Sequence, residues 1–228
     1  MIVNGMPLLM AAPIVEMFNL KVQAEPTSYG LTECGYDIRI KQDIRFIPNG
    51  NGMIASILEP HMSRPEQKHT NFLLASSIEE FQMPNNLMGQ VLNKSTWARK
   101  GLDASMTTNI EPGWNGFLTL ELIYHGREDL HIPAGSGIAQ VMFHEIMEPR
   151  VYEGKYQNQA DKPVDAITKD LLSMSNAEHV EQALSQGPVL IMDGKGVYPN
   201  NLDRAVGEER HYYKRDQPDP TKRGFTPK

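Results

Sequence analysis

The sequence predicts a mainly β domain followed by a partly helical C-terminal extension. Short apolar runs recur at close spacing, and Gly, Pro and Asn separate them, as in chains of short strands joined by tight turns. Little in the first 150 residues keeps the helical period of about 3.6 residues over a long stretch. Together these two observations favour an all-β sandwich or barrel-like domain.

The composition is that of a globular chain with an acidic balance. The chain has 228 residues, a hydrophobic fraction of 40% and a formal net charge of −6, which is enough for one good-sized domain with an appendage. General nucleic-acid binders normally carry a basic field, so no nucleic-acid partner is expected. The single cysteine, Cys34, excludes an internal disulfide and favours a reducing cytoplasm.

Neither a zinc site nor a membrane segment is predicted. One cysteine and seven scattered histidines supply no HxE with a following CxxC and no HExxH. The first twelve residues are mildly apolar, but no positively charged residues precede the apolar run and Pro7 interrupts it. We therefore expect neither a signal peptide nor a membrane span.

The expected elements of the β domain follow from alternation and from turn residues. Residues 1–22 are expected to hold a short strand and a short helix, and 34–40 alternates as a half-buried strand does. Residues 48–52 are expected to form a turn, because they are rich in residues that tolerate positive φ. We expect an exposed loop at 61–69 and further strands at 43–46, 54–58, 71–76, 86–92 and 117–122.

The composition changes after Pro149, and we divide the chain into a β domain at 1–160 and an extension at 161–228. The extension is expected to contain a helix at 166–185 ended by Gly187-Pro188, a hairpin of 189–192 with 196–198, and a loosely ordered charged tail from about 207.

Glu121 is the first candidate for chemistry. It lies between Leu120 and Leu122 in an apolar strand. Burying a carboxylate there costs free energy unless the group is paired, protonated or needed for chemistry. Two interpretations stay open from the residues alone. Glu121 is either half of a structural ion pair or a general base whose pKa is tuned by burial.

The segment from Lys94 to Arg99 is the second candidate. Its two cations and the hydroxyls of Ser95 and Thr96 suit an oxyanion or a phosphate. The residues alone favour a simpler interpretation, in which Ser95 or Asn93 caps a helix N-terminus and the cations are solvated.

Two further polar segments are open to either interpretation. Glu111 begins a turn at 111–116 that Pro and Gly shape, and it either binds a sugar hydroxyl or lies exposed, the second being favoured. Residues 154–159 either close over a phosphorylated ligand or link the β domain to the tail.

In this order, these segments resemble the motifs of the dCTP deaminase family, within the trimeric dUTPase-like superfamily. KSTWAR at 94–99 with GL at 101–102 resembles the family's (R/K)SSxARxGL signature, and IEPGWNG at 110–116 resembles its I(D/E)PGWxG turn. Similar matches are YDIRI at 36–40 with the early strand, FLTLEL at 117–122 with the TLE strand, GIAQ at 137–140 with GxxIxQ, and GKYQNQ at 154–159 with GKYQxQ. The resemblance covers roughly residues 30 to 160.

The resemblance implies a distorted jelly-roll, or β-clip, domain of dUTPase type in a homotrimer whose active sites lie at subunit interfaces. It implies hydrolytic deamination of dCTP to dUTP and ammonia, without zinc, with Mg²⁺ accompanying the triphosphate. Glu121 would be the proton shuttle, which takes a proton from the water that attacks C4 and passes it to N3 and then to the leaving amine. Whether the enzyme is bifunctional, continuing to dUMP and pyrophosphate, stays open.

The resemblance also implies a role for each matching residue. Arg99 and Ser95 would orient Glu121 and the water. The implied nucleotide contacts are Lys94, Ser95 and Thr96 with phosphates, Glu111 with the deoxyribose 3′-hydroxyl, the backbone of Thr119 and Leu120 with the base, and Tyr152, Lys155 and Gln159 as a clamp on the triphosphate.

Three departures from the family pattern leave the substrate open. Residues 103–109 are about one residue short and lack the usual His, Trp97 replaces a smaller apolar residue, and Glu111 stands where Asp is commoner. A modified cytosine nucleotide or dUTP is therefore an alternative substrate. The alternative functions are a dUTPase-type pyrophosphatase without deamination and a non-catalytic nucleotide-binding trimer.

Overall fold

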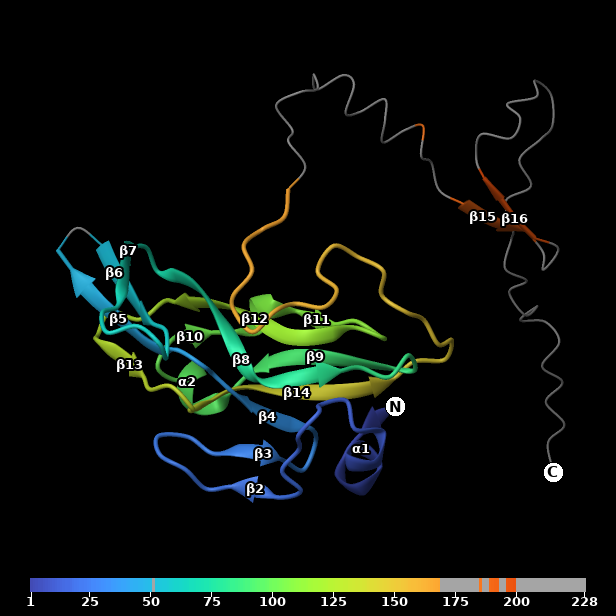
Figure 1. Ribbon diagram of the computed structural model, residues 1–228, viewed down its shortest axis with the longest axis horizontal. Helices are drawn as coiled ribbons and strands as arrows, with labels where there is room; N and C mark the ends of the chain where they lie inside the picture. The colour runs from blue at the N-terminus through green and yellow to red at the C-terminus, as the bar shows by residue number, and fades with distance from the viewer. Residues whose placement is uncertain (51, 169–184, 186–188, 193–195, 200–228) are drawn as a thin grey trace, which may run out of the picture. The chain divides into compact units, whose positions relative to one another are not determined.

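The computed structural model describes residues 1–50, 52–168, 185, 189–192 and 196–199 (Figure 1). Contacts between residues divide the chain into one unit at Met1–Ile167 and another at Thr168–Lys228. The first unit is mainly β, so the predicted class is confirmed. In the second, β15 (Val189–Met192) pairs antiparallel with β16 (Gly196–Pro199), as the predicted hairpin requires.

The largest sheet of the first unit has seven strands in the order β11-β9-β14-β4-β3-β2, and β1 pairs with the end of β14. All pairings in it are antiparallel. Its strands are β1 (Ile2–Val3), β2 (Lys21–Val22), β3 (Tyr29–Leu31), β4 (Tyr36–Arg39), β9 (Leu87–Asn93), β11 (Asn109–Ile110) and β14 (Gly137–Glu145).

Two smaller sheets and three short helical segments complete the unit. A three-stranded sheet has the order β10-β12-β8, and a four-stranded sheet has the order β13-β5-β6-β7. Their strands are β5 (Asp43–Asn49), β6 (Gly52–Leu58), β7 (Glu66–His69), β8 (Phe72–Gln82), β10 (Leu102–Asp103), β12 (Asn115–Tyr124) and β13 (Leu130–Ile132). The helical segments are α1 (Gly5–Ala11), α2 (Ser95–Ala98) and the 3-10 turn η1 (Ser105–Thr107).

The core is built by alternation, and β12 shows this most clearly. Leu118, Leu120 and Leu122 are buried, while the residues between them are only half-buried. Leu120 and Leu122 lie opposite Ala75 and Leu73 of β8, which are also core residues. Because successive side chains of a strand point to opposite faces, Glu121 lies on the face of β12 away from this core.

The structure corrects two predictions of local structure. Residues 66–69, expected to lie in a loop, form the edge strand β7, whose four side chains are all exposed. Charged side chains suit an edge that must not pair with another chain, but they leave no alternation to recognise in the sequence. Residues 166–168 are not helical, Ser185 is helical, and the rest of the expected helix at 166–185 and the tail from about 207 lie outside the described residues.

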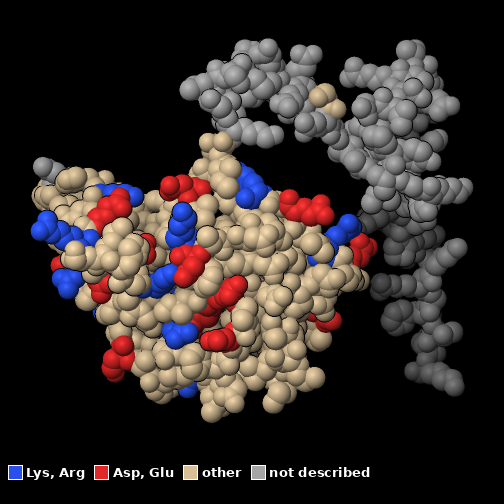
Figure 2. Space-filling view, viewed as in Figure 1, with Lys and Arg blue, Asp and Glu red and all other residues tan. Residues whose placement is uncertain are grey.

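Surface charge is mixed on the face seen in Figure 2, where acidic and basic side chains are interspersed over the first unit. A stripe of one sign, as in nucleic-acid binders, is not present on that face. Within the described part of the chain, no helix is long and apolar enough to cross a membrane.

An ion pair between a buried carboxylate and a partly exposed guanidinium joins the three-stranded and seven-stranded sheets. Glu79 of β8 accepts hydrogen bonds from the backbone N of Arg39 (2.7 Å) and from its Nε (2.8 Å) on β4. The Arg39 guanidinium also lies 5.1 Å from the ring centre of Phe18 and 4.7 Å from that of Tyr29. Burial raises the pKa of Glu79 above its ordinary value, although the hydrogen bonds from Arg39 oppose that shift.

We predict that Arg39→Met destabilises the domain by about 3–5 kcal/mol, because it leaves the Glu79 carboxylate buried without its cation. The double variant Arg39→Met/Glu79→Gln should recover most of this loss, since a neutral amide still accepts from the backbone N of residue 39. Urea unfolding measures both. Arg39 lowers the pKa of Glu79, so its loss should raise this pKa further in the native single variant than in the native wild type. The native variant then takes up a proton at a higher pH than the wild type does, so its deficit should shrink as the pH is lowered. A deficit that stays constant with pH would contradict the assignment.

Candidate active site

Glu121 sits half-buried on the outward face of β12, opposite Leu74 of β8. Its backbone N donates to Thr107 Oγ1 (2.9 Å). Its carboxylate has no hydrogen-bond or ion-pair partner among the residues that the structure describes. Burial raises the pKa of Glu121 above the usual value for glutamate. Of the two interpretations left open by the sequence, this geometry favours the general base over the structural ion pair.

The segment behind Glu121 adopts a strained turn. Thr107 is buried in η1, and Thr108 follows it with φ 62° and ψ −113°, which is unusual for a β-branched residue. Hydrogen bonds fix this conformation, since Thr108 N donates to Ser105 O (3.1 Å) and Val91 N donates to Thr108 O (2.8 Å). The turn thereby holds the Thr107 hydroxyl against the backbone of Glu121.

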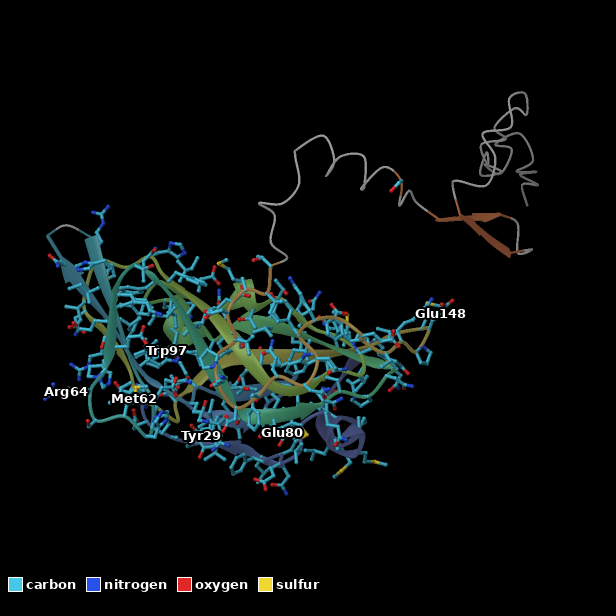
Figure 3. All side chains as sticks on the ribbon, turned by 45° about the horizontal axis from the view of Figure 1, so that its top comes forward. Tyr29, Met62, Arg64, Glu80, Trp97 and Glu148 are labelled. Atoms are coloured by element: carbon cyan, nitrogen blue, oxygen red, sulfur yellow. The ribbon has the colours of Figure 1, made fainter. Side chains whose placement is uncertain are left out.

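The segment that carries Lys94 forms a single helical turn, α2, anchored by Trp97. The Trp97 side chain is buried inside the domain (Figure 3), and its Nε1 donates to Gly137 O (2.7 Å). The predicted caps are wrong, because Lys94 precedes the helix and no side chain caps it. The Asn93 Oδ1 instead accepts from Ala104 N (2.7 Å). Anchoring through Trp97 leaves the flanking side chains exposed, which are those of Ser95, Thr96 and Arg99.

Lys94 is neither solvated nor free. Its Nζ donates to the carboxylate of Asp37 on β4 and lies 3.5 Å from Ser28 Oγ. The two side chains of the ion pair are only 11% and 4% exposed. Sequence reasoning missed Asp37, although an acid within an apolar strand is the same signal that drew attention to Glu121.

A polar pocket of about 510 Å³ lies against Lys94. Its wall carries many hydroxyl and amide groups, which suit phosphate oxygens. The polar residues lining it include Ser28, Thr32, Asn93, Ser95, Thr96 and Gln140, together with the acids Glu25, Glu33 and Asp37.

The C-terminal strap, which we define as residues 152–167, folds back onto β12 of the same chain. Phe117 N donates to Gln159 O (3.1 Å), and the Thr119 hydroxyl donates to Gln159 Oε1 (2.9 Å). Tyr152 is half-buried, and its hydroxyl accepts from Tyr156 N (3.4 Å). The strap therefore reaches the outward face of β12 two residues from Glu121.

Among the described residues, no hydrogen bond or ion pair joins the side chains of the remaining predicted residues to the Glu121 carboxylate. No hydrogen bond or ion pair joins Glu121 to Arg99 or Ser95 in the described ranges. Glu111 is exposed, and Leu120 is fully buried with its side chain in the core. The Lys155 Nζ donates to Ile167 O within the strap and lies 5.0 Å from the ring centre of Tyr156.

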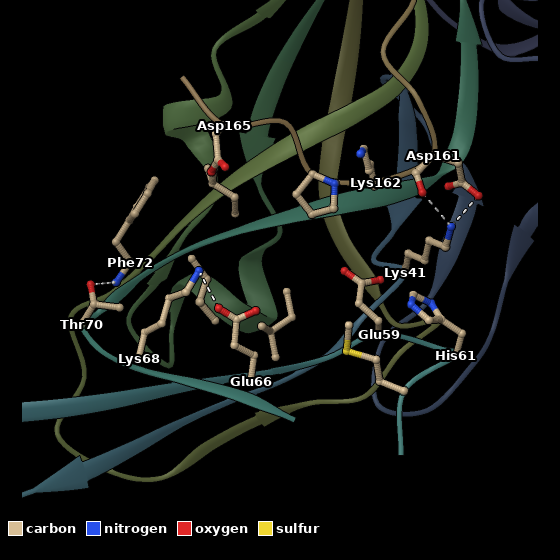
Figure 4. A pocket seen from close by; sticks show the side chains of 15 residues that line it. Lys41, Glu59, His61, Glu66, Lys68, Thr70, Phe72, Asp161, Lys162 and Asp165 are labelled. Carbon is tan, nitrogen blue, oxygen red and sulfur yellow. Dashed lines mark hydrogen bonds and ion pairs between the residues drawn. The ribbon is translucent and has the colours of Figure 1, made fainter. Parts of the chain in front are cut away.

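A second pocket, of about 630 Å³, opens between β6, β7, β8 and the strap (Figure 4). Four of its charged side chains form two ion pairs, Lys41 with Asp161 and Lys68 with Glu66 (3.0 Å). None of the predicted site residues lines it, although Leu74 does. In the described part of the chain, no three His, Cys, Asp or Glu side chains converge in a way that would hold a metal ion.

We predict that Thr108→Gly stabilises the protein by on the order of 1 kcal/mol. Glycine removes strain of roughly 1–3 kcal/mol at positive φ, against about 0.5–1 kcal/mol for its greater freedom in the unfolded chain. Thermal unfolding measures the change. Thr96→Gly in α2 is the matched control and should destabilise. A lower Tm for Thr108→Gly would show that this turn is not strained.

A family model described as dCTP deaminase-like matches residues 11–146. A dCTP deaminase of Herpetosiphon aurantiacus is 37% identical over 155 residues, covering 61% of this chain and 82% of the relative. One of Roseiflexus castenholzii is 34% identical over 148 residues, covering 58% and 78%. A solved structure of native EIAV dUTPase is 17% identical with a TM-score of 0.38, covering 62% of this chain and 96% of that one.

Proposed function

Since the chain belongs to the dCTP deaminase-like family, we propose that it catalyses the reaction of dCTP with water to give dUTP and ammonia, with Glu121 as the proton shuttle. The observation that carries this proposal is the state of Glu121. Its carboxylate is half-buried, lacks a partner in the described chain and has a pKa raised by burial. Because its pKa is raised, such a carboxylate holds a proton more readily than an ordinary glutamate does, and it can serve first as base and then as acid.

The proposed proton path uses one carboxylate twice. Ionised Glu121 takes a proton from the water as its oxygen attacks C4 of the cytosine ring, and it passes that proton to N3. The hydroxyl left on C4 then loses its proton through Glu121 to the amino group, and the C4–N bond breaks to release ammonia. The hydrogen bond from Glu121 N to Thr107 Oγ1 (2.9 Å) supports this role, because it holds the strand that carries the carboxylate.

The remaining nucleotide contacts are proposed on the same family basis. The hydroxyl-lined pocket beside Lys94 supports phosphate binding by Lys94, Ser95 and Thr96. Residues Tyr152, Lys155 and Gln159 would clamp the triphosphate, which enters as its Mg²⁺ complex and so brings the metal with the substrate. The other proposed contacts are Glu111 with the 3′-hydroxyl and the backbone of Thr119 and Leu120 with the base.

A second copy of the chain would complete the site. Arg99 and Ser95 are exposed, and within the described ranges their side chains have no partner, as is also true of the Glu121 carboxylate. An unpaired cation and an unpaired carboxylate on different surfaces are complementary across an interface. We therefore propose a homotrimer in which Arg99 and Ser95 of one subunit orient Glu121 and the water of another.

We also propose a cytoplasmic location, since the single cysteine, Cys34, is exposed and free.

We predict that Glu121→Gln lowers the rate of ammonia release from dCTP by about 10²–10⁴-fold, because the amide cannot carry the proton. Glu80→Gln, an exposed glutamate on the neighbouring β8, is the matched control and should leave the rate unchanged. The assay follows ammonia, dUTP, dUMP and pyrophosphate with Mg²⁺ present. Full activity of Glu121→Gln would remove Glu121 from the mechanism.

The same products separate the alternatives. Ammonia with dUTP alone identifies a deaminase, and ammonia with dUMP and pyrophosphate identifies a bifunctional enzyme. Pyrophosphate without ammonia, from dUTP, identifies a dUTPase-type hydrolase. If the protein turns over neither dCTP nor dUTP but does turn over a modified cytosine nucleoside triphosphate, that modified nucleotide is the substrate. If it binds nucleotides without turning any over, it is a non-catalytic nucleotide-binding trimer.

We predict a pH dependence that reports Glu121. The base must be ionised in the free enzyme, so kcat/KM should fall as the pH drops through the pKa of Glu121, and that pKa should lie above the ordinary glutamate value of about 4.3. Rates measured across the acid range give the inflection. The affinity for dCTP, measured over the same pH range, shows whether the fall in kcat/KM comes from protonation of the triphosphate and not from Glu121. An inflection at or below the ordinary value would contradict the role of burial.

A further inference from the structure

We infer that Gln157 is a positioning residue, which locks the C-terminal strap onto the turn at 113–115 of its own chain and so places Lys155 and Gln159 for the triphosphate. This inference rests on the function proposed above. Gln157 itself touches no substrate in this assignment, and it acts through the two clamp residues on either side of it.

The Gln157 amide uses its whole hydrogen-bonding capacity. Its Nε2 donates to Gly113 O (2.9 Å) and to Tyr152 O (2.9 Å). Its Oε1 accepts from Asn115 N (2.8 Å) and from Asn158 N (3.1 Å). A side-chain amide has two donors and two acceptor lone pairs, so none is left over. All four partners are backbone groups, whose positions the chain itself fixes.

The turn that receives Gln157 is shaped to fit the strap. Tyr152 N donates to Pro112 O (2.8 Å), and Trp114 Nε1 donates to Tyr156 O (2.6 Å). Gly113 has a φ of +71°, and a Cβ there would lie 3.0 Å from Val151 Cγ1. The strap and the turn therefore interlock on both sides of Gln157, which makes this amide the centre of the contact.

The same arrangement carries Gln159 to β12. Gly116 has a φ of +125°, and a Cβ there would lie 2.5 Å from both N and O of Gln159, so only glycine lets the strap approach this closely. Gln159 forms a parallel bridge with Gly116, and its Oε1 accepts from Thr119 N (3.3 Å). Gln157 thus holds a strap whose clamp residues belong to the same chain as Glu121.

The test compares Gln157→Ala with Gln90→Ala, which changes an exposed glutamine on β9. We expect Gln157→Ala to raise KM for Mg·dCTP about tenfold, because the hydrogen bonds that hold the strap are lost, with kcat within about twofold. Any fall in Tm should be small, because the strap can open locally while the rest of the domain stays folded. A KM equal to that of the control would overturn the inference. A lower Tm with reduced kcat and unchanged KM would assign Gln157 to folding alone and would also overturn it.

A second comparison asks whether Gln157 acts through the clamp. Adding Gln157→Ala to a Lys155→Ala/Gln159→Ala background should raise KM no further, because a positioning residue has nothing left to position. A further tenfold rise in that background would mean that Gln157 binds the nucleotide directly. Gln157→Glu keeps the size of the side chain and its two acceptor contacts but loses both donors. It should show the same rise in KM, and it replaces Gln157→Ala in the test if the alanine variant folds poorly.

A third readout does not depend on turnover. Lys155 lies within the strap, and tryptic cleavage after it should be faster in Gln157→Ala than in Gln90→Ala, because the strap opens more often. If the wild-type protein deaminates no nucleotide, the proposed function fails while this measurement still tests the anchor. Equal cleavage rates would overturn the inference whatever the activity.

Discussion

The alternation of β12 is the constraint on which the candidate site depends. Leu118, Leu120 and Leu122 pack into the core, so Thr119 and Glu121 must face the other way. A slip of one residue against β8 would exchange the two faces and place a carboxylate in the core, where its desolvation is far more costly. The packing of the leucines thereby sets the half-buried position of Glu121, and that position raises its pKa without help from a neighbouring charge.

The C-terminal strap packs on the outward face of β12, so the residues proposed to bind the base and those proposed to bind the triphosphate lie on the same face. The Thr119 hydroxyl donates to Gln159 Oε1 (2.9 Å) and accepts from Val164 N (3.1 Å). Gly116 permits this approach because any side chain there would meet the strap backbone. The residues proposed for the base and for the triphosphate therefore come together through one strand, although about 40 residues separate them in the chain.

The sequence predicts what periodicity and motif order carry, and it misses what depends on a partner far along the chain. The strand at 117–122 was predictable because apolar residues bracket Glu121. The edge strand β7 was not, because it has no apolar face. Trp97 was visible only as a departure from the family pattern, since the acceptor of its Nε1, Gly137 O, lies 40 residues away. The roles of the individual site residues and the division at residue 160 stay predictions.

Lys94 shows how such a distant partner changes the chemistry of a motif. The sequence offered a solvated cation or a phosphate ligand, whereas the structure pairs Lys94 with Asp37 in a nearly buried ion pair. The pair has no net charge, so it would contribute little long-range attraction for the proposed triphosphate, and exposed cations such as Arg99 would have to supply that attraction. An ammonium group has three donors. One is held by Asp37 and another faces Ser28 Oγ, so the third is the one that would serve the phosphate contact proposed for Lys94. Under that proposal, Asp37 would fix the position of the Lys94 ammonium group while neutralising its charge.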